Sequence, residues 1–174
     1  MRRVILGTIG LLFFSIPGFA QEYVYPKAEV FGGFSIASVD TGLTRESLLG
    51  WQSAVHGNFH SNLGFTADIG GQYKTISGVS VNSHQFLFGP RLFVRKEKVT
   101  PYVHGLFGAA RLSAAGISDT GLGMGIGGGL DVNLSDRLSI RVAQFDWTPS
   151  RFSGTWSTSE YRIGFGIVIK AANQ

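Results

Sequence analysis

The segment EYRIGFGIVIK, residues 160–170, carries the clearest repeating pattern in the chain. Every second residue is large and apolar, and the residues between them are mostly glycine or charged. Successive side chains of a β-strand point to opposite faces of a sheet, so this period of two predicts a strand with one apolar face. The apolar face comprises Tyr161, Ile163, Phe165, Ile167 and Ile169, and the other face comprises Glu160, Arg162, Gly164, Gly166 and Lys170.

Seven earlier segments alternate in the same way, although the segment at residues 99–111 does so most weakly. After residue 26 no segment keeps a helical apolar stripe for three turns, so the chain is predicted to be all-β with eight strands. The seven segments lie at residues 29–36, 51–60, 65–73, 85–95, 99–111, 122–132 and 138–142.

The chemistry of the two faces indicates which one points inward. Charged residues are 15% of the chain, against about 25% in a typical soluble domain. A soluble eight-stranded barrel such as a lipocalin would need a charged exterior, whereas here the second face is mostly Gly, Ser, Ala and Gln. That face suits a narrow lumen, and the Phe, Ile, Leu and Val face suits lipid. Because open sheet edges are not tolerated in a bilayer, we predict a closed, eight-stranded antiparallel up-and-down transmembrane β-barrel.

The gaps between the predicted strands alternate in length, which supports the same fold. Long gaps on one side and short turns on the other are typical of outer-membrane barrels, whose long connections face outward. The long gaps are 38–49, 74–82, 112–121 and 148–157, and the short ones are 61–62, 96–98 and 134–137. Aromatic residues near the long gaps predict a girdle at the outer membrane interface; these are Trp51, Tyr73, Trp147, Trp156 and Tyr161.

The first twenty residues have the features of a secretory signal peptide. Arg2 and Arg3 precede an apolar run, and the small residues Gly18 and Ala20 precede Gln21. The run is shorter than the roughly 20 residues that a membrane-spanning helix needs. We therefore predict a cleaved signal peptide at residues 1–20 and an outer-membrane β-barrel domain at residues 21–174, which gives a location in the cell outer membrane of a Gram-negative bacterium.

Charge and cysteine content exclude several classes of function. The formal net charge of +4 includes both arginines of the signal peptide, so the mature chain carries +2. This weak bias argues neither for nor against nucleic-acid binding, and no nucleic-acid partner is predicted. The chain has no cysteine, which excludes disulfide bonds and thiolate metal sites.

Two segments carry a resemblance to a known family. PYVHGLFGAAR, residues 101–111, and GIGGGLDVNLSDRLSIRV, residues 125–142, resemble the OmpA-like, porin-like small barrels, and the likeness extends over the mature chain. It implies an outer-membrane location and insertion by the barrel-assembly machinery, but no particular activity. Such barrels usually end on an aromatic residue, whereas this chain ends KAANQ. A Gly-x-x-Φ-x-Φ assembly signal, where Φ is apolar, can instead be read in Gly164, Ile167 and Ile169.

A glycine-rich motif at residues 123–128, GMGIGG, matches the dinucleotide-binding pattern. No strand–turn–helix follows it, so the match is interpreted as spurious and no cofactor is predicted. The glycines fit lumen-facing positions with little room for a side chain.

The histidines are the candidates for metal binding or acid–base chemistry. Folding the chain about the short turns sets His56 opposite Asp68 and Arg91 opposite His104, all facing the lumen, where the four could form one belt. A histidine beside an aspartate is part of a catalytic triad, but no serine lies at a suitable position. His60 and His84 complete the set. We therefore predict no catalytic, cofactor-binding or metal site, and interpret the belt as charge pairing in a narrow lumen.

The turn at residues 134–137 allows a more specific prediction. Folding about Asp136 sets Asn133 opposite Ser139, and Asp131 opposite Arg141, with both charged residues in the lumen. Opposed residues in an antiparallel pair have Cβ atoms about 4.5–5.5 Å apart, so an ion pair is predicted.

The functional prediction is a non-enzymatic barrel with a side-chain-filled lumen and four surface loops, in a structural or surface-interaction role. A narrow porin-like channel for small solutes is the alternative, and a lipid-modifying outer-membrane enzyme is a third possibility. The predicted partners are outer-membrane lipid and lipopolysaccharide, the barrel-assembly machinery and an extracellular ligand bound through the loops.

Overall fold

The computed structural model describes residues 25–40, 45–76 and 78–171. The predicted signal peptide lies outside the described residues. The strands are β1 (Ala28–Asp40), β2 (Arg45–Asn58), β3 (Leu63–Ile76), β4 (Val79–Phe93), β5 (Val99–Ala114), β6 (Ile117–Asn133), β7 (Leu138–Trp147), β8 (Ser150–Phe152), β9 (Thr155–Ser157) and β10 (Tyr161–Lys170). Across the described part of the chain there is no helix long and apolar enough to cross a membrane.

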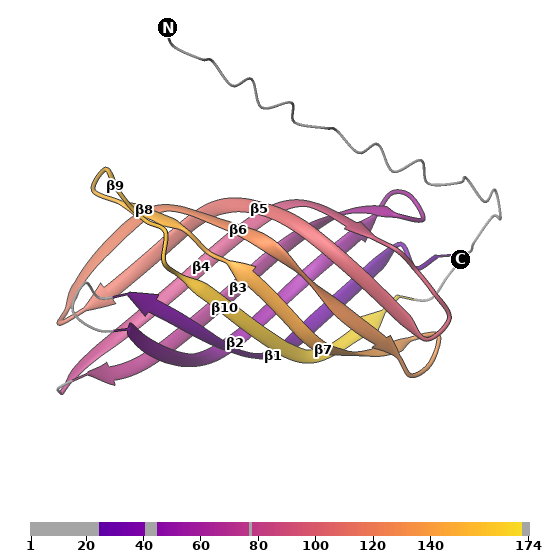
Figure 1. Ribbon diagram of the computed structural model, residues 1–174, viewed down its shortest axis with the longest axis horizontal. Helices are drawn as coiled ribbons and strands as arrows, with labels where there is room; N and C mark the ends of the chain where they lie inside the picture. The colour runs from indigo at the N-terminus through magenta and orange to yellow at the C-terminus, as the bar shows by residue number, and fades with distance from the viewer. Residues whose placement is uncertain (1–24, 41–44, 77, 172–174) are drawn as a thin grey trace, which may run out of the picture.

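Eight of these strands form a closed antiparallel barrel, which confirms the predicted fold (Figure 1). Each of β1 to β6 pairs with the next strand along the chain, and β10 pairs with both β7 and β1 to close the sheet. The two short strands β8 and β9 form a hairpin, and β8 adds to the end of β6. The sequence pattern therefore gave the number of barrel strands correctly but did not indicate the hairpin.

The strands are strongly staggered around the barrel. A path that starts at Ala28 and steps from each residue to its partner on the neighbouring strand passes through Gly57 and Phe65. It continues around the barrel through Ile126, Trp147 and Tyr161 and returns to β1 at Ser38. The register thus advances by ten residues in one revolution. Strand number and stagger together fix the width of a barrel, and at eight strands the interior is just wide enough to be filled by side chains.

The two faces of the strands are oriented as the sequence predicted. Phe88 is 43% exposed and Ile126 is 47% exposed on the outer wall, whereas Glu29 and Asp68, from the opposite face, are each 2% exposed inside. Large exposed apolar side chains on all eight barrel strands form a continuous outer band, as expected for a surface that contacts lipid.

The barrel has two distinct ends. At the near end, where β1 begins and β10 ends, the connections are the short turns that the sequence predicted (Figure 1, right). At the far end the strands run further than predicted, so the predicted long gaps at 38–49, 74–82 and 112–121 are mostly strand rather than loop. β5 and β6 continue to a two-residue turn at Ala115 and Gly116, which have φ angles of 52° and 79°. Both values are positive, as in the tight turns that match the twist of a hairpin.

These extended strand ends were missed because their outward face changes from apolar to polar, while the other face carries apolar residues such as Leu112 and Ile117. Ser113 faces Ser118 across the β5–β6 ladder, and their hydroxyl groups hydrogen-bond at 2.9 Å. The apolar-outward alternation of the outer band therefore stops at this level, although backbone pairing continues. The far end is therefore a set of polar hairpins, and the exposed Trp51 and Tyr73 lie within long strands rather than at strand ends.

Candidate functional site

The lumen holds an unusual concentration of buried charge. Arg91 on β4, Arg141 on β7 and Arg162 on β10 are each only 1% exposed. Buried ions are costly unless they are paired and hydrogen-bonded, so each guanidinium group needs acidic partners inside the barrel. These partners divide the lumen into a near cluster (Glu29, Arg91, Asp131 and Arg141) and a far cluster (Asp68, His104, Asp146 and Arg162).

Asp131 is the centre of the near cluster. Its carboxylate accepts two hydrogen bonds from Arg141, from Nε at 2.8 Å and from Nη2 at 3.1 Å. It also accepts one from Nη2 of Arg91 at 3.0 Å, and Nη1 of Arg91 donates to Glu29 at 3.1 Å. Asp131 lies opposite Arg141, and Asn133 opposite Ser139, so the predicted ion pair and its register are confirmed.

Aromatic rings support the two arginines of the near cluster. The ring of Tyr102 lies between them, with its centroid 4.1 Å from Cζ of Arg91 and 4.6 Å from Cζ of Arg141. On the other side of Arg141, the ring of Phe31 lies 4.1 Å from the same carbon. Cation–π contacts strengthen when water is excluded, so these rings stabilise charges that the carboxylates only partly surround.

The far cluster places one arginine between two carboxylates. Arg162 donates from Nη1 to Asp68 at 2.9 Å, and from Nε and Nη2 to Asp146 at 3.1 and 2.7 Å. Nε2 of His104 lies 2.9 Å from Asp146, and Gln52 donates to Asp68 at 2.5 Å. All four members of the far cluster are at most 7% exposed, so the arrangement fills the lumen with polar groups that satisfy one another.

Gln144 connects the two clusters. Its carbonyl oxygen accepts hydrogen bonds from Arg141 and from the Tyr102 hydroxyl, both at 2.8 Å, and its amide donates to Asp146 at 2.7 Å. Neither Gln144 nor Asp146 was predicted from the sequence to face the lumen.

A bulge in β7 is the reason that these two residues were missed. Leu130 on β6 lies opposite Ala143, but the next residue, Asp131, lies opposite Arg141, so Val142 is the extra residue of the bulge. Both Val142 and Ala143 are exposed outside the barrel. Two successive outward residues reverse the alternation, so inward positions change from odd to even numbers along β7. The sequence does contain a signal of this change, because the large apolar residues are even-numbered up to Val142 and odd-numbered from Phe145.

The histidine predictions were half right. Arg91 lies opposite His104, as predicted. His56 lies opposite Thr66 rather than Asp68, and its Nδ1 is 2.8 Å from the Thr66 hydroxyl. The hydrogen bond from the backbone N–H of Phe59 to the carbonyl of Leu63 centres the turn one residue earlier than predicted. Asp68 consequently joins the far cluster instead of forming a belt with His56.

The other two histidines lie apart from the lumen clusters. His60 is in the near-end turn beside Ser61, and His84 is on the outer wall beside Tyr73. Among residues 25–40, 45–76 and 78–171, no group of three or more histidine or acidic side chains is placed to hold a metal ion. Both lumen histidines are buried within the filled interior, and His104 has a carboxylate partner rather than a hydroxyl.

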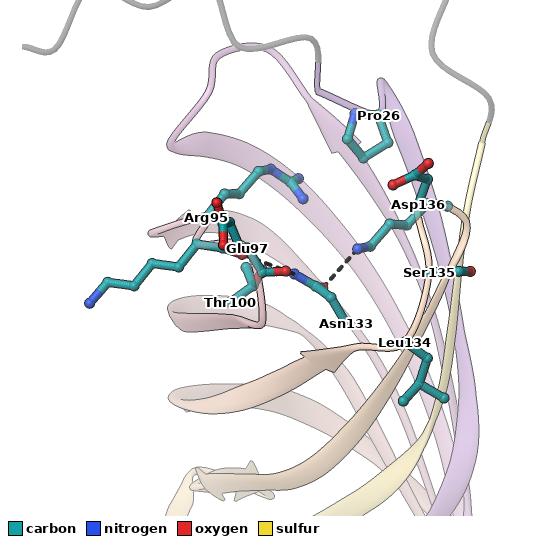
Figure 2. A pocket seen from close by; sticks show the side chains of 10 residues that line it. Pro26, Arg95, Glu97, Thr100, Asn133, Leu134, Ser135 and Asp136 are labelled. Carbon is teal, nitrogen blue, oxygen red and sulfur yellow. Dashed lines mark hydrogen bonds between the residues drawn. The ribbon is translucent and has the colours of Figure 1, made fainter.

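The near end contains an open pocket of about 400 Å³ (Figure 2). Its wall includes the 134–137 turn and the side chain of Asn133, whose carbonyl oxygen accepts a hydrogen bond from Lys170 at 2.8 Å. The amide of Asn133 donates to the backbone carbonyls of Lys96 and Glu97, so it ties two near-end turns together. Arg95 lies between the pocket and the lumen and pairs with Glu29 at 2.7 Å.

The β8–β9 hairpin continues the barrel wall beside β6 at the far end. Ser150 on β8 is 1% exposed and donates a hydrogen bond to Glu160 at 3.1 Å. Burial raises the pKa of the Glu160 carboxyl, and hydrogen bonds from Ser157 and Ser150 act in the opposite direction. A small space of about 30 Å³ remains beneath the hairpin, between Phe152, Gln85 and Leu112.

Comparison with known proteins places this geometry among small outer-membrane barrels. No family model and no curated protein sequence matches the chain. Among solved structures, Neisserial surface protein A (NspA) is similar, with a TM-score of 0.70 and 15% sequence identity over 83% of this chain and 97% of the other.

Two further structures share the architecture. Ail, the attachment invasion locus protein of Yersinia pestis, matches with a TM-score of 0.62 and 18% identity over 84% of this chain and 99% of Ail. The N-terminal β-barrel domain of Pseudomonas aeruginosa OprF matches with a TM-score of 0.54 and 11% identity over 84% and 98% of the two chains. At these identities the likeness shows the fold, which is that of the small, OmpA-like eight-stranded outer-membrane barrels.

Proposed function

We propose that this chain is a non-enzymatic protein of the Gram-negative outer membrane, with a side-chain-filled lumen and polar hairpins presented to the exterior. In this orientation the near end faces the periplasm, and the far end, including the β8–β9 hairpin, faces outward. The observation that carries the proposal is the buried ion-pair network, because every charged group of the two clusters is held by another part of the wall. Such a lumen supports a closed structural unit better than a solute path.

The arrangement of the lumen histidines supports a role without catalysis. His104 pairs with Asp146, but a hydrolytic triad also needs a nucleophile within reach of the imidazole and of the substrate. His56 contacts the Thr66 hydroxyl at 2.8 Å, yet both side chains are only 1% exposed. A lipid or peptide substrate would have to displace the buried arginines to reach them.

The polar strand extensions support a role in surface contact. β3 to β6 continue beyond the apolar band as two hairpins, which hold polar backbone and side chains away from the membrane. Ail, which shares the fold, has also been solved with the heparin analogue sucrose octasulfate. A sulfated glycan is therefore a suitable first probe for an extracellular ligand of this chain.

Shortening one hairpin tests the surface role. Replacing residues 113–118 by Asn-Gly keeps Leu112 paired with Asp119 and closes the ladder with a favoured tight turn. We expect cells producing the full-length protein to adhere to heparin-coated surfaces, and cells producing the shortened variant to lose that adhesion. Adhesion is measured against uncoated surfaces in a strain that lacks the chromosomal gene.

Two controls accompany this experiment. Lys98→Ala alters a near-end turn and should leave adhesion unchanged, and a tag inserted between Ala115 and Gly116 should be labelled on intact cells. Each variant should still migrate differently on gels before and after boiling, as folded barrels do. Adhesion that is equal for the full-length and shortened proteins, with both folded, would contradict the surface role.

Planar-bilayer recording tests the filled lumen against the alternative of a narrow channel. We expect no steady single-channel conductance from the purified protein, because Arg91, Arg141 and Arg162 occupy the lumen at 1% exposure each. The reference is a large porin recorded under the same conditions. Large, stable conductance steps that scale with protein concentration would show that the lumen conducts.

A further inference from the structure

The outer wall changes from apolar to polar at a well-defined level on four consecutive strands. The last apolar residues on the outward face of β3, β4, β5 and β6 are Ile69, Phe86, Ala109 and Leu122. Further toward the far end the same faces carry Thr75, Asn82, Ser113 and Ser118. The edge of the hydrocarbon layer therefore lies between these two sets, where interfacial aromatic residues meet lipid headgroups.

A chain of hydrogen bonds occupies this boundary on β2 to β4. Nε1 of Trp51 donates to the Tyr73 hydroxyl at 3.2 Å, and that hydroxyl lies 3.1 Å from Nε2 of His84. The rings of Tyr73 and His84 meet edge to face, with centroids 5.5 Å apart. Gly71 lies beneath them and makes the arrangement possible, since a Cβ atom there would be 2.8 Å from the Tyr73 hydroxyl oxygen.

An indole nitrogen can only donate, so the Tyr73 oxygen accepts from Trp51, and the roles of Tyr73 and His84 in their own hydrogen bond depend on the tautomer of His84. In the tautomer that accepts from Tyr73 at Nε2, the imidazole carries its proton at Nδ1. In that tautomer the His84 ring donates from Nδ1 at the level of the boundary.

Arg111 adds a cation beside His84. It lies directly opposite His84 on β5 and opposite Thr120 on β6, on the exposed outer face. Within the described ranges no residue forms a hydrogen bond or ion pair with its guanidinium group. The outward positions around it are aromatic, apolar, hydroxyl or amide residues, and none is acidic. This differs from the three lumen arginines, each of which has a carboxylate partner.

We propose that Arg111 and His84 bind the phosphate of an outer-leaflet lipid headgroup. A guanidinium group matches phosphate in geometry and charge and can donate two parallel hydrogen bonds to it. The site has apolar wall on one side, for acyl chains, and hydroxyl-bearing strands on the other, for the polar part of a phosphorylated glycolipid. A soluble phosphate ion would need only the Arg111 cation, and the apolar wall beside the site would contribute nothing to its binding. The inference rests on the proposed outer-membrane location and assigns it a specific lipid contact.

Native mass spectrometry of the purified barrel provides the test, with diphosphorylated lipid A as the probe and dephosphorylated lipid A as its matched comparison. The wild type should retain the phosphorylated form preferentially. Arg111→Gln removes a charge-assisted hydrogen-bonding partner, and loss of such a partner weakens affinity by about tenfold or more. His84→Phe keeps the ring but removes the donor, and should reduce retention by a smaller factor.

Arg137→Gln is the matched control. It removes the same charge from an exposed arginine in the near-end turn at residues 134–137, at the opposite end of the barrel. Retention by this variant should equal that of the wild type. Equal losses for Arg111→Gln and Arg137→Gln would show general charge attraction, and equal binding of the two lipid A forms would overturn the phosphate site. Displacement of lipid A by inorganic phosphate alone would overturn the lipid assignment.

This outcome can be separated from that of the proposed function. The measurement uses purified, folded barrel, confirmed by its migration before and after boiling, and does not depend on adhesion or conductance. If the protein adheres and does not conduct but shows no preference for phosphorylated lipid A, the lipid site alone is wrong.

Discussion

Replacing Asp131 by alanine is expected to destabilise the folded barrel by about 3–5 kcal/mol, because removal of one partner leaves a buried charge uncompensated. Asp131 is 3% exposed and binds both Arg91 and Arg141, so its loss affects two cations at once. The measurement is urea unfolding in lipid vesicles. Asp136→Ala in the neighbouring turn removes the same charge from an exposed side chain and should change stability by no more than about 0.5 kcal/mol.

A double-mutant cycle separates the ion pair from the general cost of truncation. Arg141→Ala alone should also be strongly destabilising, whereas Asp131→Ala with Arg141→Ala should cost less than the sum of the two. Residues in one ion-pair network show coupling of about 0.5–3 kcal/mol. Additive effects would mean that the two groups act independently despite their distance of 2.8 Å.

Placing a charge on the outer wall is expected to have the second-largest effect. Outward positions on β6 run from Val132 near one edge of the apolar band to Leu122 at the other, and Ile126 lies midway between them. An arginine near the bilayer midplane of a barrel costs about 2–4 kcal/mol, so Ile126→Arg should lower the free energy of unfolding by that amount. The same vesicle-based urea unfolding measures it.

Position along one strand provides the control for this prediction. Ser118→Arg places the same side chain on the same face of β6, but beyond the apolar band, and should cost about 0–1 kcal/mol because the cost falls toward and beyond the interface. If Ile126→Arg were as stable as the wild type, the outer wall would not be in lipid at that depth.

The fold was predictable from the sequence because each barrel strand separates two chemically different faces. Alternation places Phe88 outside and Asp68 inside without knowledge of any partner. Where the outward face becomes polar, as at Ser113 and Ser118, the apolar-outward alternation stops, and the strands were predicted to end too early. The limit is physical, since only burial enforces alternation.

The partners of individual residues were harder to predict than their faces. An error of one residue in the centre of a turn shifts the register by two, which leaves each side chain on its correct face but gives it a different neighbour. This explains why His56 was assigned to Asp68 instead of Thr66, while the turn centred on Asp136 gave Asp131 and Arg141 correctly. The bulge at Val142 and Ala143 hid Asp146 for a different reason, because it changes the face itself.

The ion pairs across the lumen also constrain the order in which the barrel can assemble. Arg91 and Glu29 are 62 residues apart in sequence, and Arg162 and Asp68 are 94 apart. Contacts of such long range form only after the intervening chain has been brought together, and folds dominated by them fold slowly. Arg162 lies on the last strand, so Asp68 on β3 has no cationic partner until nearly the whole chain is present at the membrane. Neutralisation of Asp68 and Asp146 by Arg162 is therefore a late event that coincides with closure of β10 against β1.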